Sequence, residues 1–214
     1  MRIFPYTEAG EDHSENEDWI LYSMHPSAEN RLLVCIADGA GGYPDGLKAS
    51  RTACETAMRF CHDRSWQELL IPSTWDWIFR ETDSVVGNVC DGRTALLAFA
   101  LDKSSLTGGS VGDSKLFFHD GLSILDLTER QKIKPVIGAG SGFATFFHCE
   151  NPNGRVYAMT DGVWKYCGFK EIEGSINIPI ETVPGKLRQN CELKNGELPD
   201  DFSIIAVAME ERTS

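Results

Sequence analysis

The sequence of 214 residues has little positive charge and no long hydrophobic run. Its 20 lysines and arginines stand against 32 aspartates and glutamates, which gives a formal net charge of −12 at pH 7. Binding to nucleic acid or to anionic membranes depends on clustered basic side chains, so we expect neither as a partner. No run of about 18 consecutive apolar residues is present, and residues 1–6 do not open a signal-like apolar segment. The sequence therefore predicts a cytoplasmic protein.

The seven cysteines also lack the spacing of a metal or redox motif, because no C-x-x-C pair occurs among them. Most lie in apolar surroundings, such as Cys35 between Val34 and Ile36. An odd number of cysteines without paired spacing is typical of reduced thiols in a hydrophobic core. Neither a disulfide framework nor a zinc site is expected.

What the sequence does have is an ordinary globular composition, with 42% hydrophobic and 24% charged residues and no repeat or low-complexity segment. We expect one domain over residues 1–214. Apolar runs bounded by turn residues predict strands at 19–23, 31–37, 95–101, 109–111, 115–119, 123–127, 143–149, 156–159 and 202–209. Helical spacing predicts helices at 45–61, from Ser65 with an interruption at Pro72 and a restart at 73–74, and at 184–189. This order predicts a layered α+β domain whose later strands form a meander.

Four aspartates lie where an apolar strand begins or ends, namely Asp38, Asp113, Asp161 and Asp200. A carboxylate at the end of a buried strand loses solvation and needs a positive partner. Few basic residues lie near them in sequence, with Lys115 and Lys165 the nearest. Several desolvated carboxylates with few cations indicate a site for a hard metal ion, because Mg²⁺ and Mn²⁺ prefer oxygen ligands.

A single Asp in such a place is equally typical of a turn or a helix cap, so the prediction depends on the joint pattern. Glu17 and Asp18, just before the first predicted strand, add two acids that would act through metal-bound water.

The acidic segments resemble the ordered motifs of the metal-dependent protein phosphatases of the type 2C class. The matching segments, in the family's order, are 16–18 (Asn-Glu-Asp), 37–42 (Ala-Asp-Gly-Ala-Gly-Gly), 92–95 (Gly-Arg-Thr-Ala), 111–114 (Val-Gly-Asp-Ser), 159–164 (Met-Thr-Asp-Gly-Val-Trp) and 200–203 (Asp-Asp-Phe-Ser). These segments are distributed along nearly the whole chain, from residue 16 to residue 203.

The resemblance implies a four-layer α-β-β-α sandwich, with two antiparallel sheets flanked by antiparallel helix pairs. It also implies two Mn²⁺ or Mg²⁺ ions, with a weaker third, and a serine/threonine protein phosphatase in which a metal-bridging hydroxide attacks phosphorus in line. On this resemblance Asp38 bridges the metals, the Gly39 carbonyl binds one, and Asp161 with Asp200 binds the other. Glu17 and Asp18 act through metal-bound waters, and Asp113 belongs to the third site. The expected partner is a phosphorylated protein, with a Ser/Thr kinase acting in opposition.

Three positions depart from the family pattern, and the span from Asp113 to Asp161 is short, which predicts a reduced flap. His13 stands where the family places a phosphate-gripping Arg; it either donates a hydrogen bond to phosphate as a catalytic residue or is an idle surface histidine. Ala40 stands where some members carry a His. Lys165 stands where many carry another Asp, and it would disfavour the third metal or substitute for its charge.

These departures leave two alternatives open beside the active enzyme. One is a pseudophosphatase that keeps the fold as a regulatory or protein-binding module, which the residues at positions 13 and 165 favour. The other is a metal-dependent phosphoesterase that acts on nucleotides or small molecules. Retention of Asp38, Asp161 and Asp200 favours the enzyme, because repelling acids cost stability that a scaffold has no need to lose.

Overall fold

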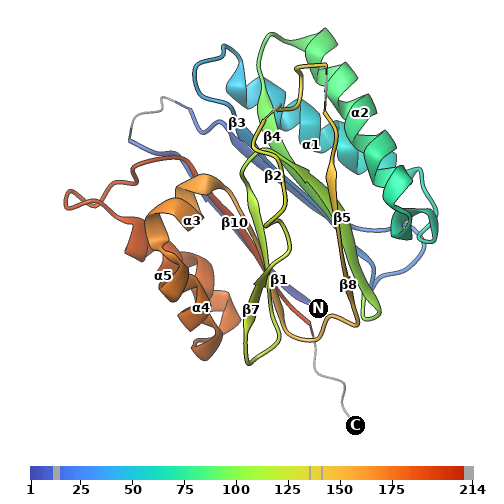
Figure 1. Ribbon diagram of the computed structural model, residues 1–214. Coiled ribbons are helices and arrows are strands. Elements are labelled where there is room, and N and C mark those ends of the chain that lie inside the picture. Colours follow the sequence, from blue (N-terminus) through green and yellow to red (C-terminus); the bar gives the residue numbers. More distant parts are fainter. Residues whose placement is uncertain (12–14, 135, 141, 210–214) are drawn as a thin grey trace.

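The computed structural model describes residues 1–11, 15–134, 136–140 and 142–209, which form two five-stranded antiparallel sheets with helices on their outer faces (Figure 1). The first sheet has the order β1 (Arg2–Glu8), β10 (Phe202–Ala208), β9 (Arg155–Met159), β6 (Lys115–His119) and β7 (Ile124–Asp126). The second has the order β2 (Asp18–Met24), β3 (Leu32–Gly39), β4 (Thr94–Leu101), β5 (Ser105–Val111) and β8 (Thr145–Glu150). The predicted four-layer α+β sandwich is confirmed.

The helices cover the two sheets unequally. The second sheet is covered by the long helices α1 (Gly46–His62) and α2 (Pro72–Val89). The first is covered by three short helices, α3 (Asp161–Cys167), α4 (Phe169–Gly174) and α5 (Val183–Cys191), where the expectation was a helix pair. None of the described helices has the length and apolarity needed to cross a bilayer.

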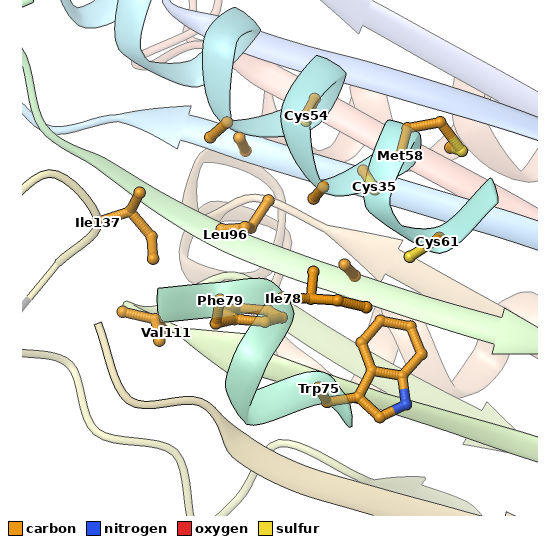
Figure 2. Packing of buried hydrophobic residues seen from close by; sticks show 14 of the residues in the cluster. Cys35, Cys54, Met58, Cys61, Trp75, Ile78, Phe79, Leu96, Val111 and Ile137 are labelled. Carbon is orange, nitrogen blue, oxygen red and sulfur yellow. The ribbon is translucent and has the colours of Figure 1, made fainter. Parts of the chain in front are cut away.

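Three hydrophobic clusters hold the layers together, and the alternation of side chains along a strand decides which residue joins which cluster. Along β3, Leu33 and Cys35 pack under α1 and α2, whereas Val34 and Ile36 pack between the two sheets. Figure 2 shows Cys35 close to Met58 of α1 in the first of these clusters, to which Trp75 of α2 also belongs. A strand buried on both faces reads as a continuous apolar run, which explains why the sequence predicts β3 and β4 so well.

The predicted capping box at Ser65 forms, but it opens only a short 3₁₀ turn, Glu68–Leu70. The Ser65 backbone N–H and hydroxyl donate to the Glu68 carboxylate at 2.8 and 2.7 Å. The α-helix α2 then begins at Pro72 itself, because proline lacks the backbone N–H that the first helical position leaves unbonded anyway. The helical region is interrupted as predicted, but at Ile71 and not at Pro72, and the predicted restart at 73–74 is one to two residues too late.

Two expectations about strands are wrong. Strand β1 was not predicted, because Pro5 lies within it; the strand is at the edge of its sheet and pairs only with β10. The later strands form no single meander. Hairpins β4–β5 and β6–β7 are local, but they belong to different sheets, and β8 and β9 return to opposite sheets. Strands β4 and β5 are buried along their whole length, whereas β7 and β8 are partly exposed, and neither pattern specifies which sheet a strand joins.

Candidate metal centre

Three of the predicted aspartates meet at one end of the sandwich. Asp38 lies near the end of β3, Asp113 in the crossing from β5 to β6, and Asp161 at the first position of α3. Each contributes one carboxylate oxygen to a group in which all three oxygens lie within 4.8 Å of one another. They line a cavity of about 180 Å³ whose other walls are Gly39, Ala40, Gly41, Ala95, Ile133, Lys134 and Val136. Residues 123 positions apart in the chain thus share one acidic cavity.

The backbone at Gly112 places Asp113 in this group. Gly112 has φ of +98°, a conformation that side chains other than glycine rarely adopt. A Cβ atom at this position would also lie 2.4 Å from the Cβ of Ala95 on the neighbouring strand β4. Both restrictions explain why the loop that carries Asp113 requires Gly next to Asp.

Asp38 has the most strongly perturbed electrostatic surroundings of the three. Burial raises the pKa of its carboxyl group well above the ordinary range, and the charges of Asp18, Asp161 and Asp113 raise it further. Each of these causes penalises the ionised form and would be relieved by a cation among the carboxylates.

Asp18 is opposite Asp38 in the β2–β3 ladder and is only 4% exposed. Its Oδ2 accepts a hydrogen bond from the Thr160 hydroxyl at 2.8 Å, and its buried Oδ1 has no hydrogen-bond partner among the described residues. Burial raises the pKa of Asp18 to about 8, against hydrogen bonds from Thr160 and Ser203 that lower it. An unsatisfied buried carboxylate oxygen is a suitable acceptor for a metal-bound water.

Glu17 lies against the start of α1 and lines a different cavity, of about 430 Å³, together with Asp45 and Gly46. A Cβ atom at Gly46 would lie 2.5 Å from the Glu17 carboxylate carbon, so the carboxylate occupies space that only glycine leaves free. The Glu17 carbonyl accepts the Gly39 backbone N–H at 3.1 Å, which ties the two predicted residues together.

Lys165 is a basic residue that forms ion pairs with two of the three clustered aspartates. Its ammonium group forms a short ion pair with Asp161, one helical turn earlier in α3, and a second with Asp113 at 3.4 Å. Burial lowers the pKa of Lys165, but its hydrogen bond to Asp161 and the charges of both aspartates outweigh burial and raise it overall. The i, i+4 spacing of Asp161 and Lys165 is visible in the sequence, whereas the contact with Asp113 is not.

Asp200, the predicted metal ligand, is followed by a second aspartate, Asp201, which accepts hydrogen bonds from backbone N–H groups. Asp200 accepts the backbone N–H of Asp201 at 2.9 Å and is not among the three clustered carboxylates. Asp201, which the sequence reasoning did not single out, is buried and accepts the backbone N–H groups of Gly10 and Glu17 at 2.8 and 2.6 Å. In the sequence, Asp201 is recognisable only as the second acid of an Asp-Asp pair before a buried strand. Its two hydrogen bonds connect Gly10 and Glu17 to the start of β10.

Two of the departures from the motif pattern remain to be placed. His13 lies outside the described residues. Ala40 lines the cavity, and its backbone N–H donates to the Arg93 carbonyl at 2.8 Å.

The donor set fits a hard divalent cation. The three clustered groups are carboxylates, the ligand type that Mg²⁺ and Mn²⁺ prefer, and their spacing suits oxygens around one or two ions. Asp18 adds a buried acceptor without a partner among the described residues. These are the features expected for a metal centre with water ligands.

No protein-family model matches the sequence, and no curated protein matches it significantly. Solved structures do match in fold. The serine/threonine phosphatase PstP/Ppp of Mycobacterium tuberculosis has a TM-score of 0.80 and 20% identity over 98% of this chain and 99% of its own. The serine/threonine phosphatase of Staphylococcus aureus has a TM-score of 0.79 and 17% identity over 97% of this chain and 94% of its own. The catalytic domain of PstP in complex with two manganese ions has a TM-score of 0.79 and 20% identity, with 96% of each chain covered.

These similarities cover nearly the full length on both sides, so the chain has the fold of bacterial serine/threonine phosphatases of the type 2C class.

Proposed function

We propose that this chain, which shares the fold of those phosphatases, is an Mn²⁺- or Mg²⁺-dependent phosphatase acting on phosphoserine or phosphothreonine in proteins. The observation that carries the proposal is the meeting of Asp38, Asp113 and Asp161 in one cavity at the end of the sandwich. The structure of PstP with two manganese ions supports the choice of metal.

The chain's own residues would divide the work as follows. Asp38, at the centre of the repulsion, would bridge two ions, with the Gly39 carbonyl on one side and Asp161 and Asp200 on the other. Glu17 and Asp18 would orient metal-bound water, and Thr160 keeps Asp18 in position through its hydrogen bond. Two divalent ions would supply a hydroxide near neutral pH and neutralise charge on the phosphate.

The substrate phosphate needs positive charge from the chain as well. Lys134 lines the acidic cavity and forms no ion pair among the described residues, so it can meet an incoming anion. Together with the metals it would offset the repulsion between an acidic protein and a phosphorylated partner.

The decisive measurement is turnover of p-nitrophenyl phosphate and of a phosphothreonine peptide, with Mn²⁺ and with a chelator. Asp38→Asn and Asp161→Asn should each lower kcat/KM at least about 100-fold, the equivalent of about 2.7 kcal/mol of transition-state stabilisation. Asp63→Asn removes the same charge at the far end of α1, where Asp63 is exposed, and should leave turnover unchanged. Turnover without added metal, or turnover that survives both active-site changes, would contradict the proposal.

A regulatory module without catalytic activity is the second candidate, and the ion pairs of Lys165 with Asp161 and Asp113 favour it. It predicts that folded protein binds the phosphothreonine peptide, as measured by fluorescence polarisation, without Mn²⁺-dependent hydrolysis. Hydrolysis at a rate that depends on Mn²⁺ eliminates this candidate.

A further inference from the structure

The ammonium group of Lys165 lies between two carboxylates of the candidate metal centre. Its ion pairs reach Asp161 and Asp113, whose side chains are 17% and 28% exposed, while the Lys165 side chain is 44% exposed. Among the residues that the structure describes, no other basic side chain forms an ion pair with Asp38, Asp113 or Asp161. The positive charge of Lys165 therefore neutralises part of the negative charge of the three aspartates.

The surroundings hold this ammonium group in place. Lys165 lies on α3, whose Val163 and Cys167 are buried in the cluster under the first sheet, so the helix is fixed to the sheet. The indole N–H of Trp164 donates to the Asp113 carbonyl at 2.9 Å, which joins the helix to the loop that carries Asp113. The Lys165 ammonium also lies 5.6 Å from the centre of the Trp164 ring, a favourable cation–π distance.

A divalent ion and an ammonium group cannot share the same carboxylate oxygens without repulsion. An ion shared by Asp161 and Asp113 would have to displace Lys165 from both, whereas an ion on the Asp38 side would compete for Asp161 alone. Divalent cations would therefore meet more competition from Lys165 between Asp161 and Asp113 than beside Asp38.

We propose that Lys165 is a resident cation that takes the place of a divalent ion between Asp161 and Asp113. It confines metal binding to the Asp38 side and weakens it there through competition for Asp161. The inference rests on the proposed metal centre and goes beyond it, because it assigns Asp113 to Lys165 and not to a metal. It also predicts that the metal-free protein depends on Lys165 for the stability of the cluster.

The experiment uses the full chain and Mn²⁺ alone, with bound Mn²⁺ determined from the paramagnetic resonance signal of the free ion. Lys165→Met keeps the length of the side chain and removes its charge. Lys170→Met, on the exposed face of the neighbouring helix α4, removes the same charge away from the cluster and is the matched control. Lys165→Arg keeps the charge and should behave like the wild type.

Lys165→Met should bind Mn²⁺ about tenfold more tightly than the wild type and bind one more ion per chain. Its melting temperature should fall below that of the wild type in chelator, and it should rise more than that of the wild type when Mn²⁺ is added. Lys170→Met should change neither quantity. A purely structural lysine would lower the melting temperature equally in both conditions, so the opposite responses distinguish the two roles. Lys165→Gln provides the same test if the methionine variant does not fold.

Equal Mn²⁺ binding by the wild type and by Lys165→Met overturns this inference and leaves the proposed metal centre standing. Mn²⁺ binding by Lys165→Met but not by the wild type supports the inference and contradicts the proposed enzyme. Absence of Mn²⁺ binding in every variant overturns both.

Discussion

The hydroxyl of Thr160 donates a hydrogen bond of 2.8 Å to the carboxylate of Asp18, and this bond joins the two sheets at the candidate metal centre. Asp18 opens β2 in the second sheet, and Thr160 directly follows β9 in the first. The Thr160 oxygen in turn accepts the backbone N–H of Ser203 at 3.2 Å, at the start of β10. The position of Asp18, a candidate site residue, thus depends on a contact with the other sheet, made by a residue far away in the sequence.

Replacement of Thr160 by Val should destabilise the protein by about 2 kcal/mol, because it removes one hydrogen bond to the buried Asp18 carboxylate and the acceptor of the buried Ser203 N–H. Thr160→Ser keeps the hydroxyl and should lose less than half as much. Urea unfolding of the three proteins measures the difference. If the valine variant is as stable as the wild type, the hydrogen bond between the sheets contributes nothing to stability.

Asp201 should matter for the order of the segment before β2. Asp201→Ala removes the acceptor of the Gly10 and Glu17 N–H groups and should cost about 2–3 kcal/mol, since both bonds involve a charged, buried group. Asp201→Asn keeps one acceptor oxygen and should lie between the alanine variant and the wild type. Hydrogen exchange at Gly10 and Glu17 should accelerate in the same order. Unchanged protection at both amides in Asp201→Ala would contradict this role.

Gly162 is the contact point between α3 and the start of β10. A Cβ atom there would lie 2.0 Å from the Asp201 carbonyl oxygen, a backbone atom that cannot move without shifting β10. Gly162→Ala should therefore destabilise by about 3 kcal/mol or more. Gly185→Ala in α5 is the matched control, because nothing lies within 4 Å of its Cβ position. It should stabilise by up to about 1 kcal/mol through helix propensity, and thermal unfolding of both variants tests the contrast.

The Glu8–Arg188 ion pair should make stability depend on pH. Arg188 donates to Glu8 at 2.7 and 3.0 Å, and this hydrogen bonding lowers the pKa of Glu8 against the opposing effect of burial. A carboxyl group with a lowered pKa in the folded state stabilises above its unfolded pKa, ordinarily near 4.5, and the contribution is lost as pH falls through the folded value. The wild type should exceed Glu8→Gln in unfolding free energy at pH 7 by under about 1 kcal/mol, since the pair is partly exposed.

That difference should shrink below pH 4.5 and disappear in an Arg188→Gln background. Urea denaturation across this range is the measurement. A gap between the wild type and Glu8→Gln that stays constant with pH would mean that the pair contributes nothing specific to the ionised carboxylate.

Much of the candidate site could be predicted from the sequence, because its residues occur in local patterns. Asp38, Asp113 and Asp161 each follow or end an apolar segment beside a glycine, and the structure brings these three together. The strands β3 and β4 could be predicted for a similar reason, since burial on both faces requires an unbroken apolar run. Asp201 shows in the sequence only as the second acid of an Asp-Asp pair, and its role could not be predicted, because its partners are backbone N–H groups from the other end of the chain.

The sequence by itself determined which segments are strands and helices in most of the chain, and it determined the acidic chemistry at the strand ends. The periodicity of apolar side chains and the positions of turn residues are local properties of the sequence, so they can be recognised without knowledge of the tertiary structure. Only the tertiary structure decided that β1 pairs with β10, which sheet each later strand joins, and that Lys165 lies between Asp161 and Asp113. These are contacts between distant segments, and they depend on how two sheets with apolar faces pack, which no local pattern specifies.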